Sequence, residues 1–119
     1  MVNIINKNNQ PICKTDEDGT KYWLLNGKIH REDGPAVEDV NGTKEWWYND
    51  QRHRIGGPAV EDEDADGHKE WFIHGQLHRE DGPAIEYSDG HKEWYLHGKH
   101  INCSSQEEFE RLIKLKFLF

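Results

Sequence analysis

A repeated residue pattern runs through most of the chain and constrains its fold more than any other feature of the sequence. The tripeptide Gly-Pro-Ala occurs three times, at steps of 23 and then 25 residues, and begins at Gly34, Gly57 and Gly82. The dipeptide His-Arg recurs with the same steps, beginning at His30, His53 and His78. A glycine lies four residues before each of four tryptophans, Trp23, Trp46, Trp71 and Trp94, which number the units one to four below. Pro11 lies where a further, divergent copy of Gly-Pro-Ala would begin. The repeats therefore span residues 10–102.

Each unit has the pattern of a β-hairpin. A short extended segment leads to a turn of the Asp-Gly or Asn-Gly type, which favours tight hairpins. These turns are predicted at Asp18-Gly19, Asn41-Gly42, Asp66-Gly67 and Asp89-Gly90. A strand rich in aromatic and β-branched residues follows and ends at a second turn. The second turns are predicted at Asn26-Gly27, Asn49-Asp50, His74-Gly75 and His97-Gly98. The sequence thus predicts a mainly β fold, an elongated antiparallel sheet of tandem hairpins.

Alternation along the aromatic strands separates two faces of this sheet. One face carries the four tryptophans of the repeat and their apolar neighbours, and we expect it to be the core side. The other face alternates acidic and aromatic residues, and we expect it to be at least half exposed to water. Its aromatic row is Leu24, Trp47, Phe72 and Tyr95.

The C-terminal segment, residues 104–119, changes from strand to helix signals. Ser105 with Glu108 three residues later is a capping box. Apolar residues then follow at helical spacing, beginning with Phe109 and Leu112. A helix of this length is marginal in water by itself, so we expect it to pack against the apolar end of the sheet. Residues 1–119 are predicted to form a single domain.

Composition narrows the classes of partner. The chain of 119 residues has a net charge of −8 and 34% hydrophobic residues. Its mean hydropathy is −1.05, which suits a thin sheet rather than a thick globular core. The acidic balance argues against nucleic acid and against anionic membranes as partners. The first ten residues have no signal-peptide core, and Cys13 and Cys103 lie far apart in the array, so we expect a cytoplasmic protein with two free thiols.

The segment of residues 66–84, DGHKEWFIHGQLHREDGPA, resembles a MORN-type repeat. Its pattern of His-Arg followed by Gly-Pro-Ala is similar to repeats in uncharacterised proteins of phages and large DNA viruses. The resemblance implies an open sheet of hairpins used for protein contacts and self-association. The fourth unit departs from this pattern, because Ile101 stands where the other units have histidine.

The histidines and acids do not predict a metal site or a cofactor. Equivalent histidines in successive hairpins lie about 10 Å apart, twice the strand spacing, which is too far to share one ion. We expect each ring to bond to a neighbouring turn instead. Two alternatives stay open: a site at His97, His100 and Cys103, and a weak calcium loop at Asp62-x-Asp64-x-Asp66-Gly67, which has Ile73 at the twelfth position where calcium loops need an acid.

The residues expected to bind a partner protein combine aromatic anchors with charges that break the repeat. The second unit has Asp50 in place of the turn glycine and Ile55-Gly56 in place of Glu-Asp, and the third contains a two-residue insertion within residues 61–65. The predicted binding residues are Trp47, Asp50, Arg52, Glu61, Asp62, Glu63, Asp64, Phe72 and Tyr95.

No motif of an enzyme is present, so we expect a non-enzymatic interaction module. The similarity of the repeats to those of phage and viral proteins implies a phage or viral protein that binds and inhibits a host defence protein. Three alternatives compete: an antitoxin, a nucleotide-binding sponge and an acidic mimic of DNA. We also expect a homodimer, formed through the C-terminal helix or through the first strand of the sheet.

Overall fold

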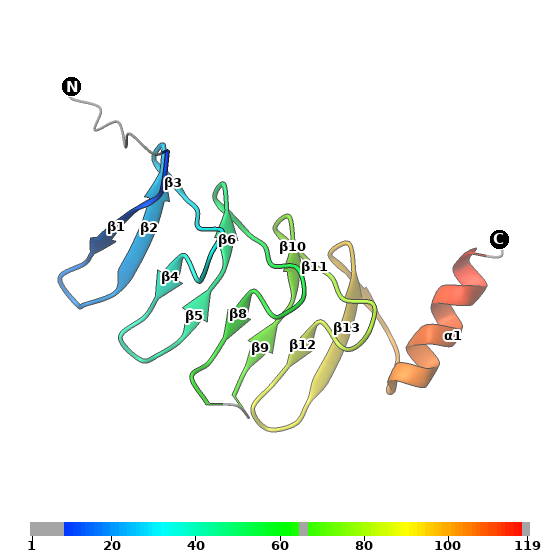
Figure 1. Cartoon of the computed structure of the whole chain (residues 1–119). Coiled ribbons are helices and arrows are strands. Elements are labelled where there is room, and N and C mark those ends of the chain that lie inside the picture. The colour runs from blue at the N-terminus through cyan, green and yellow to red at the C-terminus, as the bar shows by residue number, and fades with distance from the viewer. Residues whose placement is uncertain (1–8, 65–66, 118–119) are drawn as a thin grey trace.

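The computed structural model describes residues 9–64 and 67–117 of the chain. The protein is mainly β and elongated, with principal extents of 54 × 33 × 20 Å. Four hairpin units follow one another along its length, and a helix lies beyond the last unit (Figure 1). The predicted fold class is confirmed.

The described strands are antiparallel, and ten of them form one sheet with the order β1-β2-β4-β5-β8-β9-β12-β13-β14 and β3 beside β2. The hairpins β6-β7 and β10-β11 form separate two-stranded ladders. The elements are β1 (Ile12–Thr15), β2 (Lys21–Leu25), β3 (Lys28–Ile29), β4 (Val37–Glu38), β5 (Lys44–Glu45), β6 (Trp47–Tyr48), β7 (Gln51–Arg52), β8 (Val60–Glu61), β9 (Lys69–Glu70), β10 (Phe72–Ile73), β11 (Gln76–Leu77), β12 (Ile85–Glu86), β13 (Lys92–Leu96), β14 (Lys99–Ile101) and α1 (Gln106–Phe117).

The repeated tryptophan is the point where each long strand changes its partner. Trp46 donates its N–H to the carbonyl of Ala59 in the next unit at 2.7 Å, and its own carbonyl accepts the N–H of His53 at 3.0 Å. Trp71 makes the same pair of bonds with Ala84 and His78. Each unit therefore pairs with its successor in the main sheet and then closes its own short hairpin.

The two kinds of turn behave differently from each other. The second turns are tight, with positive φ at both central residues of each, as predicted: Asn26-Gly27, Asn49-Asp50, His74-Gly75 and His97-Gly98. The first turns of the first, second and fourth units are wider than the predicted two residues, and Asp66 of the third lies outside the described residues. Asp16 N–H donates to the carbonyl of Thr20 at 2.8 Å, and Gly19 N–H donates to the carbonyl of Asp16 at 3.0 Å. Three residues thus lie in the loop, and only its glycine has positive φ, 96°.

The core differs in one respect from the predicted tryptophan ladder. The alanines of Gly-Pro-Ala have no exposed surface, and the β-branched residues that follow them are 6–8% exposed; these are Ala36, Val37, Ala59, Val60, Ala84 and Ile85. Trp23, Trp46 and Trp71 are only half-buried. The reason is that each Gly-Pro-Ala strand is hydrogen-bonded on both sides, as Ala59 is to Glu70 and Trp46. The tryptophans instead lie on a surface of the sheet.

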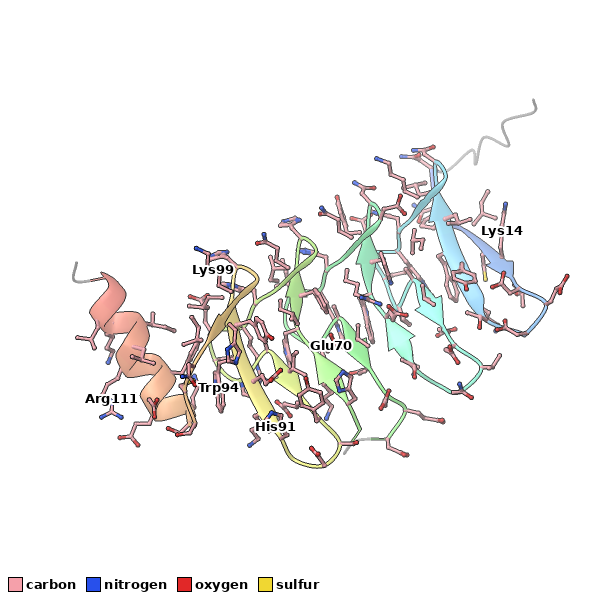
Figure 2. All side chains as sticks on the ribbon, turned by 180° about the vertical axis from the view of Figure 1, so that it is seen from behind. Lys14, Glu70, His91, Trp94, Lys99 and Arg111 are labelled. Carbon is pink, nitrogen blue, oxygen red and sulfur yellow. The ribbon has the colours of Figure 1, made fainter. Side chains whose placement is uncertain are left out.

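Helix α1 packs on the fourth unit, as the sequence predicts. Ser105 Oγ accepts the N–H of Glu108 at 3.1 Å, which confirms the helix start. Phe109 is fully buried, with its ring centroid 6.5 Å from that of Trp94. Trp94 is only 4% exposed and faces the helix (Figure 2).

Candidate functional site

An open groove lies where the second and third hairpins meet. It has a volume of about 470 Å³ and is lined by Trp47, Asp50, Gln51, Arg52, Phe72, His74, Gly75 and Gln76. We call it the aromatic groove. It brings together four of the nine residues predicted to bind a partner: Trp47, Asp50, Arg52 and Phe72. Its two aromatic walls come from β6 of one unit and β10 of the next.

Arg52 lies between the aromatic walls of this groove. Its guanidinium carbon is 5.2 Å from the ring centroid of Trp47 and 5.6 Å from that of Phe72. Its Nε donates to Glu45 Oε1 at 2.8 Å, and the indole Nε1 of Trp47 donates to the same oxygen at 3.3 Å. Glu45 therefore fixes both side chains and offsets the charge of Arg52. Glu45 belongs to the acidic and aromatic face but was not among the predicted binding residues.

Asp50 joins two units as well as lining the groove. Its φ is 66°, in a turn position that the other units fill with glycine. Its N–H donates to the carbonyl of Ile29 at 2.9 Å, and its Oδ1 accepts the N–H of Ile29 at 2.7 Å. The side chain thus adds one hydrogen bond between the first and second units that glycine could not make.

The other predicted binding residues lie outside this groove. Tyr95, on β13, packs its ring against His100 at 5.2 Å. The acidic loop after β8 lies at the opposite end of the hairpins from the turn between β6 and β7 (Figure 1). Asp62 closes that loop by accepting the N–H of His68 at 3.0 Å and the hydroxyl of Thr43 at 3.3 Å.

The remaining acids of the loop also have local contacts. Glu61 lies 3.8 Å from Arg54. Glu63 packs against Gly42, where a Cβ would lie 2.5 Å from its Oε2. The carbonyl of Asp64 accepts the N–H of Gly67 at 2.9 Å. This loop is therefore partly structural, and the structure does not bring it together with Trp47 and Phe72.

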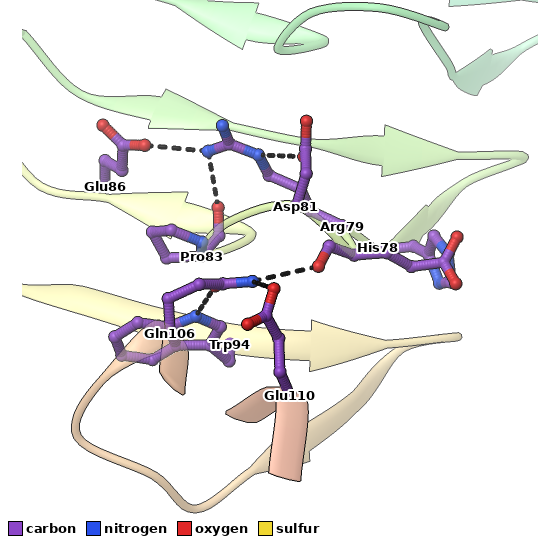
Figure 3. Close-up of polar contacts among 9 residues, drawn as sticks. His78, Arg79, Asp81, Pro83, Glu86, Trp94, Gln106 and Glu110 are labelled. Carbon is purple, nitrogen blue, oxygen red and sulfur yellow. Dashed lines mark hydrogen bonds and ion pairs between the residues drawn. The ribbon is translucent and has the colours of Figure 1, made fainter. Parts of the chain in front are cut away.

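A stacked arginine covers each of the first three repeated tryptophans, a feature that the sequence analysis missed. Arg31, Arg54 and Arg79 lie over Trp23, Trp46 and Trp71 with guanidinium carbons 4.0, 3.7 and 3.8 Å from the ring centroids. In the third unit, Arg79 Nη1 also donates to the carbonyl of Pro83 at 3.1 Å (Figure 3). A Cβ on Gly82 would lie 2.5 Å from this guanidinium. The constant spacing of His-Arg and Gly-Pro was the signal of this contact.

The repeated histidines bind neighbouring turns, as the analysis of spacing expected. The Nδ1 atoms of His30, His53 and His78 accept the N–H of Asn49, His74 and His97 at 3.1, 2.9 and 3.0 Å. The rings of His53 and His74 also stack with centroids 4.3 Å apart. Burial, and then the neighbouring His74, lower the pKa of His53 below its usual 6.5. These contacts hold the hairpins in register.

The described residues contain no group of three or more histidines, cysteines, aspartates or glutamates arranged to hold a metal ion. Asp66, part of the calcium alternative, lies outside those residues. Cys13 and Cys103 are both free thiols, as predicted. Burial, followed by the nearby Glu108 carboxylate, raises the pKa of the Cys103 thiol.

No known protein family, curated protein or solved structure matches the chain. Within residues 9–64 and 67–117, no helix has the length and apolar character needed to cross a membrane. The geometry of the repeats and of their grooves therefore has to support any functional proposal.

Proposed function

We propose that the chain is a non-enzymatic interaction module that binds a partner protein in the aromatic groove. The supporting observation is that Trp47 and Phe72, from successive units, flank Arg52 in one open groove. Tryptophan and arginine dominate the residues that contribute most to binding at protein interfaces. Both aromatic side chains are half-buried, so they are held in place and still present a surface.

The groove suits an apolar side chain of a partner better than a free anion. Glu45 already occupies the Nε of Arg52 at 2.8 Å, so the guanidinium has no unmatched charge to offer. Gln51 and Gln76, on the rim, supply amide donors and acceptors for the backbone of a bound segment. A partner that packs an apolar residue over the rings would bury them at little cost in conformational entropy.

The resemblance of the repeats to those of phage and viral proteins supports a proposal about the origin and partner of this module. We propose a phage or viral protein that acts in the host cytoplasm on a host defence protein, without a cofactor, nucleic acid or membrane as partner. We also propose a homodimer that uses the exposed side of α1. Leu112 and Leu115 on that helix are 38% and 51% exposed.

The groove is tested by comparing the unchanged chain with the variant Trp47→Ser as immobilised baits in lysate of a candidate host. A protein bound through the groove should be retained at least about 30-fold less by the variant, the effect of losing about 2 kcal/mol at an interface anchor. Val40→Ser is the matched control, because Val40 is apolar, 56% exposed and outside the groove. Equal retention by both variants would contradict the proposal.

A further inference from the structure

The second unit lacks two carboxylates that the first and third units place beside His-Arg. Asp33 and Asp81 accept hydrogen bonds from the Nε of Arg31 and Arg79 at 3.0 and 2.9 Å. The preceding glutamates also lie 3.6 and 3.7 Å from the ring Nε2 of their histidines. The second unit has Ile55-Gly56 at these two positions. Arg54 is therefore the one stacked arginine of the three without this acidic partner.

Arg54 nevertheless keeps its position in the repeat. It stacks 3.7 Å from the ring centroid of Trp46 and donates from Nη1 to the carbonyl of Pro58 at 3.0 Å. In the described part of the chain its only acidic partner is Glu61, at 3.8 Å. Arg79, by contrast, is bound by Glu86 at 2.8 Å as well as by Asp81 (Figure 3). The Arg54 guanidinium is thus held in place, but no carboxylate of the described residues accepts a hydrogen bond at its Nε edge. We call this edge unmatched.

Arg54 lines an open groove of about 500 Å³. Its walls are the loop of residues 54–58 and, from the third unit, Trp71, Ile73 and the loop of residues 78–81. We call it the Arg54 groove. Ile73 lines it while Phe72 lines the aromatic groove, so the two lie on opposite faces of β10. Ile55 is 82% exposed beside Arg54, and Gly56 has a φ of 88°, a left-handed conformation that Asp33 and Asp81 do not share.

We propose that the Arg54 groove binds a segment of a partner protein that carries an aspartate or glutamate next to an apolar residue. The carboxylate takes the position that Asp33 and Asp81 occupy in the neighbouring units and pairs with the Nε edge of Arg54. The apolar residue covers Ile55. Because the guanidinium is already fixed by its stack, little conformational entropy is lost when the pair forms.

Charges around the groove restrict what can enter it. Glu80 and Asp81 stand on the far wall, and the chain as a whole carries −8. Asp81 is matched by Arg79, but Glu80 is 75% exposed in its side chain and repels a second negative charge. A single carboxylate flanked by apolar atoms therefore fits, whereas phosphate and nucleic acid are disfavoured.

The test is an NMR titration of the full chain with the blocked dipeptide acetyl-Leu-Asp-amide, following the Nε–Hε signal of each arginine. The Arg54 signal should shift and saturate at millimolar dipeptide, while the Arg79 signal, matched by Asp81, should stay in place. Acetyl-Leu-Asn-amide should bind at least about tenfold more weakly, because a neutral amide makes the weaker hydrogen bond. Equal shifts with the two dipeptides, or equal binding of sodium phosphate, would overturn the proposal.

Two variants test the site without removing Arg54. The double variant Ile55→Glu with Gly56→Asp restores the sequence of the other units. Residue 56 should then leave its φ of 88° for the backbone conformation of Asp33 and Asp81, so that its own carboxylate occupies the edge and abolishes the shift. The converse variant Glu32→Ile with Asp33→Gly should make the Arg31 signal respond to acetyl-Leu-Asp-amide, because α1 packs on the tryptophan of the fourth unit and not on that of the second. Binding that survives the first variant unchanged would refute the proposed position. Failure of the second variant to gain a response would refute the role of the missing carboxylates.

Discussion

Trp71 in the third unit and Trp94 in the fourth occupy the same position of the repeat but are covered by different parts of the chain. Arg79, eight residues after Trp71, stacks on its ring at 3.8 Å. Asn102, eight residues after Trp94, stands where that arginine would be. There α1 replaces the stack: Phe109 packs on the ring, and Gln106 Oε1 accepts the indole N–H at 2.8 Å (Figure 3).

This difference shows what an internal unit supplies for itself and what it takes from its neighbours. The arginine stack is local, and its Nη1 bond reaches the Gly-Pro-Ala segment that opens the next unit. The fourth unit has no such segment after it, because its helix begins there. Gln106 compensates by donating its amide to the carbonyl of Glu80 in the third unit at 3.1 Å. A terminal repeat thus needs an atypical element to finish the stack.

The largest expected effect comes from making the same substitution in both regions. Trp94→Ala should lower the free energy of unfolding by about 3–5 kcal/mol, the usual cost of truncating a buried tryptophan. Trp71→Ala should cost about half as much, because Trp71 is half-buried and Arg79 stays bound to Pro83 and Asp81. Urea unfolding followed by circular dichroism measures both values. A larger loss at Trp71 would show that the arginine stack stabilises more than the helix does.

A smaller effect tests the arginine stack by itself. Arg79→Gln removes the contact with Trp71 and the charged bonds to Asp81 and Glu86, so it should lower the free energy of unfolding by about 1–2 kcal/mol. Arg111→Gln, an exposed position on α1, is the control and should change it by less than about 0.5 kcal/mol. The same urea assay compares the two. Equal small losses would mean that the stack contributes nothing measurable to the internal units.

Much of the fold could be predicted because the residue pattern of the hairpin occurs several times in the sequence. Asn26-Gly27 and its equivalents adopt the positive φ values that their residue types favour. The first turns were misjudged because Asp18-Gly19 suits a two-residue turn and also a three-residue loop that ends in glycine. The alanines were overlooked as core because a short side chain between hydrogen-bonded strands leaves no strong hydrophobic signal.

The candidate site could be predicted only in part, for a physical reason. Trp47 and Phe72 are equivalent residues of successive units, so the repeat itself indicates that they lie close together. The repeat gives no such indication for the acidic residues. The conformation of their loop depends on Asp62, which accepts hydrogen bonds from His68 and Thr43. The unmatched Arg54 becomes visible only when the contacts of Arg31 and Arg79 are known.

Acid should weaken the contact between the second and third units more than it weakens the fourth unit. His53 Nδ1 accepts the N–H of His74, its ring stacks on His74, and Tyr48 packs on it at 5.9 Å. Burial and His74 lower the pKa of His53, so the folded state binds fewer protons than the unfolded state. This contribution to stability is complete above about pH 6.5, the unfolded value, and is lost as the pH falls through the lowered folded value.

The measurement is urea unfolding between pH 7.5 and pH 5, for the unchanged chain and for two variants. His53→Gln should be less stable at pH 7.5 but lose less stability on acidification, because it has no proton to take up at this position. His100→Gln, an exposed site, should follow the unchanged chain. The fourth unit has Ile101 in place of this histidine, so the indole N–H signal of Trp94 should keep its folded position in the same pH range. An unchanged slope in His53→Gln would show that the contact between the second and third units does not respond to acid.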